Sequence, residues 1–158
     1  MKALKCKDLM IFDWIQDIHQ FPMQVRVVGE DYLYADFEGN EADMWEFDDK
    51  TDTPYPIPLT EGILEKNGLY FGLTSEEQDF VGCIGVSCYH KEHWVLDEGD
   101  GCIIVIDFPN EKDGGQISIC NIMIDKYIRL VRDELFVHEL QHALRLAGLT
   151  EMANNIKL

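Results

Sequence analysis

Apolar and polar residues alternate over several short stretches at the start of the chain. Met23 to Val28 alternates in this way, and Tyr32 to Phe37 is rich in aromatic and aliphatic residues that favour strands. Met44 to Phe47 is a third such stretch, and clusters of Gly, Asp, Glu and Asn separate the three. Short strands with turn residues between them predict a small antiparallel sheet or partial barrel over residues 1–52.

Prolines interrupt this pattern over residues 53–59. Each proline fixes its own φ and disfavours helix in the residue before it, so this stretch is predicted to be extended, and we interpret it as a linker. Thr60 then provides an N-cap side chain. It would begin a helix of about two turns that ends at Asn67-Gly68.

Strand patterns return after this helix. The predicted strands are Leu69–Leu73, Gly82–His90, His93–Leu96, Cys102–Phe108, Gln116–Ile124 and Tyr127–Val131. Two clusters of turn-forming residues, at residues 97–101 and 110–115, are typical of hairpin turns. The region therefore predicts a second set of antiparallel strands.

The last element is the most periodic. Asp133 is placed to cap a helix that runs to about Ala147 and ends at Gly148. One side of this helix is an apolar stripe made of Phe136, Leu140, Ala143, Leu144 and Ala147. The other side carries Glu134, His138, Gln141, His142 and Arg145.

Together these elements predict a single α+β domain over residues 1–158. It would comprise the N-terminal small antiparallel sheet or partial barrel, the linker, and a part from residue 60 to residue 158. That part would contain a short helix, further antiparallel strands and one longer C-terminal helix packed on the sheet.

Composition narrows the possible functions. The chain has 158 residues, of which 46% are apolar, and a net charge of −17. A protein this acidic is an unlikely partner for nucleic acid, because phosphates repel it. Residues 30–52 hold ten of the thirty acids and a single base, Lys50. We interpret them as a solvated acidic face, and the weaker alternative is an acidic nucleic-acid mimic.

The cysteines and the apolar runs bear on location. The five cysteines include no Cys-x-x-Cys pair, which favours reduced thiols over a disulfide framework. No apolar run approaches the length of a signal sequence or of a membrane helix. We therefore expect a cytoplasmic protein that has no membrane partner.

One motif carries recognisable chemistry. His138-Glu139-Leu140-Gln141-His142 matches H-E-x-x-H. On a helix, two histidines four residues apart can bind one zinc ion, and the glutamate can act as general base on the metal-bound water.

The residues after the motif do not complete a zinc site. A catalytic zinc needs a third protein ligand. The extended metallopeptidase pattern requires glycine and histidine where this chain has Arg145 and Gly148, and Glu151 is the only acid after His142. We therefore expect the histidines to occupy the polar face of the helix. The alternative is a zinc-dependent hydrolase with His138 and His142 as ligands and Glu139 as base.

A second group of metal-binding residue types is Cys83, Cys88, His90 and His93. On a strand, residues 83 and 88 point to opposite faces, and the spacing matches no standard zinc site. We interpret these residues as ordinary strand cysteines and surface histidines. One of the two histidines could still supply the third ligand of the alternative zinc site.

Three segments of the chain resemble a known family. They are Asp8–Asp13, Pro56–Leu69 and Phe136–Leu149. The family comprises small proteins of unknown function encoded in gut-bacterial (Bacteroides-type) genomes, phages and mobile elements. Its members carry DLRIGN, PIPLTEEWLLKFGF and, near the C-terminus, YVHELQHALRLCG or YVHQLQNLYFALTG. The Gly-Asn of the first segment corresponds to Phe12-Asp13 in this chain.

The resemblance implies no shared catalytic activity. In the HQLQN form, the positions of Glu139 and His142 are occupied by other residues, so a zinc mechanism could not be common to the family. We therefore expect a non-catalytic accessory or protein-interaction module of a phage or mobile element, with no cofactor and an unknown protein partner. The zinc hydrolase is kept as the alternative.

Overall fold

The computed structural model describes residues 2–37, 44–72, 93–99, 101–109 and 114–158. The chain divides into two compact units. The first comprises Met1–Pro58 and Phe136–Glu139, and the second comprises Leu59–Leu135 and Leu140–Leu158. The single domain expected from the sequence stays a prediction.

The first unit is a five-stranded antiparallel sheet in the order β4-β3-β2-β1-β5. Its strands are β1 (Trp14–Gln16), β2 (Pro22–Val28), β3 (Tyr32–Asp36), β4 (Trp45–Asp48) and β5 (Tyr55–Pro56). The apolar residues of the alternating stretches face one core, made of Cys6, Leu9, Ile15, Met23, Val25, Leu33, Ala35 and Phe47. This arrangement confirms the predicted N-terminal antiparallel sheet.

The proline-rich stretch is extended, as predicted, and it also contributes a strand. β5 pairs with β1, and the Gln16 side-chain amide donates to the Pro56 carbonyl at 2.8 Å. Pro58 then forms an isolated bridge with Phe136. These pairings join segments far apart in sequence, so the local pattern could not predict them.

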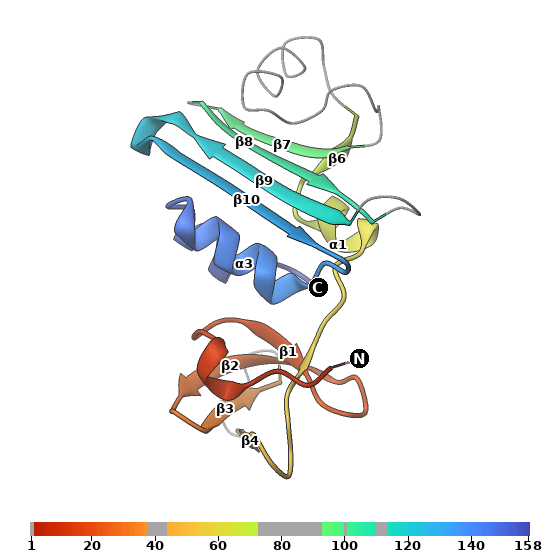
Figure 1. Cartoon of the computed structure of the whole chain (residues 1–158), viewed down its shortest axis with the longest axis vertical. Coiled ribbons are helices and arrows are strands. Elements are labelled where there is room, and N and C mark those ends of the chain that lie inside the picture. Colours follow the sequence, from red (N-terminus) through yellow and green to blue (C-terminus); the bar gives the residue numbers. More distant parts are fainter. Residues whose placement is uncertain (1, 38–43, 73–92, 100, 110–113) are drawn as a thin grey trace. The chain divides into compact units, whose positions relative to one another are not determined.

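The second unit contains an antiparallel sheet in the order β10-β9-β8-β7-β6 (Figure 1). Its strands are β6 (Tyr70–Phe71), β7 (Trp94–Gly99), β8 (Cys102–Asp107), β9 (Gly115–Asn121) and β10 (Lys126–Arg132). The predicted strand Gly82–His90 lies outside the described residues. β9 ends at Asn121 rather than at Ile124, because Ile122–Ile124 forms a short 3-10 turn, η2.

Helix α1 (Glu61–Lys66) confirms the predicted short helix. The Thr60 hydroxyl accepts a hydrogen bond from the Ile63 N–H, as expected of an N-cap residue. At the other end, Gly68 has a φ of +84°, which glycine adopts without strain, and the helix stops there.

Helix α3 (Val137–Leu146) corrects the predicted C-terminal helix at its start. The helix begins at Val137, four residues after Asp133. The Val137 N–H, one of the first four donors that have no partner within a helix, donates to the distant Ile57 carbonyl at 2.9 Å. The predicted stop is confirmed, because Gly148 has a φ of +83° and its N–H bonds to the Arg145 carbonyl.

The apolar stripe of α3 is buried, as its periodicity predicts. Leu140, Ala143, Leu144 and Ala147 are all nearly inaccessible. Phe136, the fifth predicted member, is half-buried and precedes the helix, which corrects its assignment to the stripe. The Asn121 side chain donates to the Ala147 carbonyl at 3.0 Å, which joins the end of β9 to the end of the helix. The α+β class with a C-terminal helix on a sheet is therefore confirmed.

A further helix, α4 (Thr150–Asn154), follows α3 and was not predicted. It has only five residues and no side-chain cap, so it carries no clear pattern in the sequence. None of the described helices is long and apolar enough to cross a membrane.

Candidate functional site

The H-E-x-x-H residues lie in the first turns of α3, where the chain enters the helix. His138 is 8% exposed, and its ring stacks on Phe136 with ring centroids 6.0 Å apart and planes 18° apart. The contact with the Phe136 ring restricts the orientation of the imidazole. His138 is therefore buried rather than placed on an open polar face, which corrects the expectation for this residue.

Gln141, inside the same motif, is completely buried. Its side-chain amide donates to the Ala153 carbonyl at 2.8 Å and so ties α3 to α4. A buried amide with a short hydrogen bond to backbone fixes the geometry between two helices. The sequence placed Gln141 on the polar side of the helix, and the presence of α4 explains why this position is inside.

Glu139 and His142 are both half-buried. Residues four apart lie one turn apart on the same face of a helix. His138 and His142 therefore have the spacing that two zinc-binding histidines would need. Glu151 is exposed at the start of α4. Within the described parts of the chain, no three His, Cys, Asp or Glu side chains come together as a possible metal site.

His93 is the described member of the second candidate cluster. It is buried just before β7, and its Nδ1 is paired with the Asp107 carboxylate at the end of β8. The other members, Cys83, Cys88 and His90, lie outside the described residues. His93 is therefore not a surface histidine, which corrects the expectation for this residue, and it is hydrogen-bonded to Asp107.

The described cysteines are buried and form no disulfide with one another: Cys6, Cys102 and Cys120. Burial, strengthened by a hydrogen bond with Asp49, raises the pKa of Cys6 to about 12. Burial and the negative charge of Asp125 raise the pKa of Cys120 as well. Both thiols therefore stay protonated at neutral pH, whereas a cysteine nucleophile or metal ligand needs the thiolate.

The acidic segment of residues 30–52 is tied to the first unit by hydrogen bonds. These pairs join Asp36 to Arg26, Glu46 to Tyr34, Asp48 to Thr51, Asp49 to Cys6 and Asp52 to Trp45. The Thr51 hydroxyl, together with the amides of residues 50 and 51, lowers the pKa of Asp48 to about 2. Several of these acids therefore have roles in the fold.

The η2 turn between β9 and β10 exposes three consecutive large apolar side chains. Ile122 is 57% exposed, Met123 is 74% exposed and Ile124 is 48% exposed. The turn lies at the end of the second sheet away from α1 (Figure 1). Turn positions are usually polar, and adjacent exposed apolar residues often mark an interaction site. We expected these residues to continue a strand, although their position just before Asp125 could have indicated a turn.

Backbone contacts hold the η2 turn in place. The Ile122 N–H donates to the Gly101 carbonyl at 3.1 Å, and Asp125 closes the turn in the left-handed region with a φ of +49°. A Cβ atom on Gly148 would lie 2.6 Å from Cδ1 of Ile124, so the Ile124 side chain lies against the end of α3. The turn is therefore joined to Gly101 by a backbone hydrogen bond and to the end of α3 by the Ile124 side chain.

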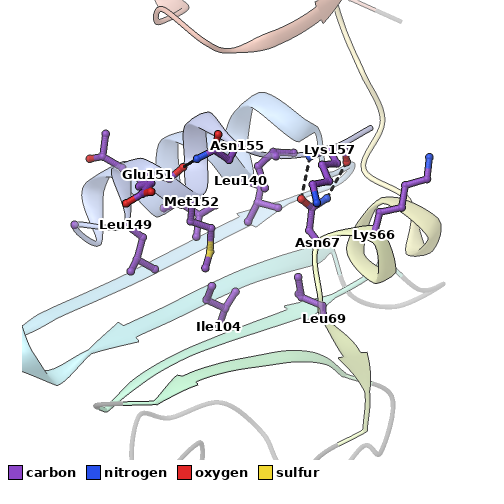
Figure 2. Close-up of a pocket in the computed structure, with 14 residues that line it drawn as sticks. Lys66, Asn67, Leu69, Ile104, Leu140, Leu149, Glu151, Met152, Asn155 and Lys157 are labelled. Atoms are coloured by element: carbon purple, nitrogen blue, oxygen red, sulfur yellow. Dashed lines mark hydrogen bonds between the residues drawn. The ribbon is translucent and has the colours of Figure 1, made fainter. Parts of the chain in front are cut away.

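A cavity of about 590 Å³ lies in the second unit, beneath α4 and the C-terminal segment (Figure 2). Its apolar wall includes Ile104 and Leu140, which are nearly inaccessible parts of the core. Across its rim, Asn67 makes two hydrogen bonds with the backbone of Lys157, at 2.8 and 2.9 Å. The C-terminal segment therefore forms part of the wall of this cavity and is joined to the residue after α1.

Comparisons with protein-family models, with curated proteins and with solved structures found no significant match for this chain. The resemblance described from the sequence therefore stays a prediction.

Proposed function

We propose that this chain is a non-catalytic protein-interaction module, and that it serves as an accessory protein of a phage or mobile element. The observation that carries the proposal is the exposed apolar η2 turn. Three adjacent large side chains on a hydrogen-bonded turn, Ile122 to Ile124, present a compact apolar anchor of the kind that partner proteins bury.

The residues of the H-E-x-x-H helix support a structural role. The two polar positions shared by both forms of the similar segments, His138 and Gln141, are buried, one by ring stacking and the other with a hydrogen bond to backbone. Glu139 and His142, which differ between the forms, are the half-buried ones. A helix selected for packing would retain the first pair, whereas a zinc site would need Glu139 and His142.

The test compares capture of proteins from the host cell by two variants. Met123→Ser/Ile124→Ser removes the exposed anchor, and Val131→Ser removes an equally exposed apolar residue at the far end of β10. Ile124 and Val131 are about half exposed, so each variant should lose about 1–2 kcal/mol of unfolding free energy and stay folded, which circular dichroism checks. The wild type and Val131→Ser should retain the same partner, and the double variant should lose it. Equal capture by all three would refute a role for the turn.

A zinc-dependent hydrolase is the alternative, because α3 places His138 and His142 on successive turns. It requires a third ligand. It predicts stoichiometric zinc and a hydrolytic activity that Glu139→Gln abolishes. Measuring bound metal and activity in the same preparation separates the two functions.

The proposed location is the cytoplasm. The three described cysteines are buried and form no disulfide with one another, which suits a reducing compartment. Fractionation of host cells that express the protein at its natural level tests this location directly.

A further inference from the structure

The η2 turn is apolar at its tip and acidic around it. Asp125 closes the turn and is exposed, and Glu151 is exposed three residues after Gly148, against which Ile124 lies. Asp97 is exposed on β7. This strand leads toward Gly101, whose carbonyl accepts the hydrogen bond from the Ile122 N–H. One exposed base, Lys126, directly follows Asp125.

The negative charge of Asp125 affects the neighbouring Cys120 thiol. Burial and, to a smaller extent, the charge of Asp125 raise the pKa of the Cys120 thiol at the end of β9. The local acidity matches the whole chain, which has a net charge of −17. Clusters of one sign attract partners of the other sign over distances of about one Debye length.

We infer that the η2 turn is the docking anchor for a positively charged partner protein, which receives Met123 in an apolar pocket and surrounds it with Lys and Arg. This inference rests on the proposed function and names the chemistry of the partner. The apolar tip would set the dissociation rate, and the acidic rim would speed association.

Two other occupants of the same surface are disfavoured by charge. A second copy of the chain carries the same net charge of −17, so copies repel one another. Anionic membranes repel the acidic rim as well. A positively charged protein is the occupant for which both the apolar tip and its surroundings are favourable.

The test places a photoreactive p-benzoylphenylalanine at position 123 of the full chain, with position 131 as a matched control on the same hairpin. Positions 126 and 131 are five residues apart along β10, or roughly 17 Å. The labelled protein is irradiated in host-cell lysate, and the cross-linked protein is identified by mass spectrometry. We expect one main product with a net positive charge from position 123 and none from position 131.

Salt and competition complete the test. The yield should fall about tenfold between 0.05 and 0.5 M NaCl, because electrostatic steering is screened. Excess unlabelled wild type should abolish the product, whereas excess Asp125→Lys/Glu151→Lys should compete poorly. An acidic or lipid product, a cross-linked dimer, equal yield from position 131, no product, or a yield unaffected by salt would each overturn the inference.

The two proposals fail differently. If the unlabelled wild type captures a host protein but position 123 does not cross-link to it, the protein is an interaction module that uses another surface. If the wild type captures nothing from the host, both proposals fall.

Discussion

Gln141 offers the sharpest test of the role assigned to the H-E-x-x-H helix. Its side chain is fully buried and donates a 2.8 Å hydrogen bond to the Ala153 carbonyl of α4. Gln141→Met keeps the length of the side chain but removes the donor. The buried Ala153 carbonyl then loses this partner, which costs about 1–3 kcal/mol.

Urea unfolding, followed by circular dichroism, measures this cost. With a slope of about 2 kcal/mol/M, the midpoint should fall by roughly 0.5–1.5 M while the slope itself stays unchanged. Gln141→Glu should lose more, at least about 3 kcal/mol, because it buries a charged acceptor against the carbonyl oxygen.

Leu146→Met is the matched control, since it introduces the same residue at an exposed position of the same helix. It should change the unfolding free energy by less than about 0.5 kcal/mol. If Gln141→Met were as stable as this control, the reasoning that Gln141 joins the two helices would be refuted.

Three further predictions concern the first unit. Phe12 has a φ of +71°, a left-handed conformation that favours glycine, so Phe12→Gly should be about 1 kcal/mol more stable than Phe12→Ala by urea unfolding; equal stability would contradict the strain. Arg26→Ala leaves the completely buried Asp36 carboxylate without its 2.7 Å partner and should cost about 3 kcal/mol, which Arg26→Met/Asp36→Asn should largely restore; a loss below about 1 kcal/mol would count against it. The pKa of Cys6 is raised from 9.0 to about 12, so the protonated thiol stabilises the folded state below pH 9, and this contribution is lost as the pH rises toward 12. Unfolding measured from pH 8 to pH 11 should therefore show a steeper loss of stability in the wild type than in Cys6→Ala, and parallel curves would refute this.

Local sequence patterns predicted most of the described elements. The period-2 stretches and the turn residues between them correspond to β2, β3 and β4, and the Thr60 cap and Gly68 stop bound α1. These signals lie within a few residues of the element that they define. The sequence was therefore a good guide wherever the stabilising contact is local.

The errors arose where a contact comes from far along the chain. α3 begins at Val137 rather than near Asp133, because the Ile57 carbonyl, 80 residues earlier, accepts the first helical N–H. β5 was interpreted as a linker segment because only its partner β1 reveals it as a strand. No pattern within a short window contains such pairings.

The candidate site shows the same division. The spacing of the H-E-x-x-H motif correctly placed it on a helix, but helical periodicity alone assigned Gln141 to the polar side. Its burial depends on α4, a five-residue helix that is too short to be predicted from a periodic pattern. The η2 turn was missed because three apolar residues resemble the end of a strand.

We propose that the H-E-x-x-H helix serves packing and that the protein acts by binding another protein. The most direct measurement is the bound-metal content of protein purified without a histidine tag, determined by elemental mass spectrometry for the wild type and for His142→Asn. If the helix serves packing, both proteins should contain far less than one zinc per chain. About one zinc per chain in the wild type, lost in His142→Asn, would contradict this proposal and establish His142 as a metal ligand.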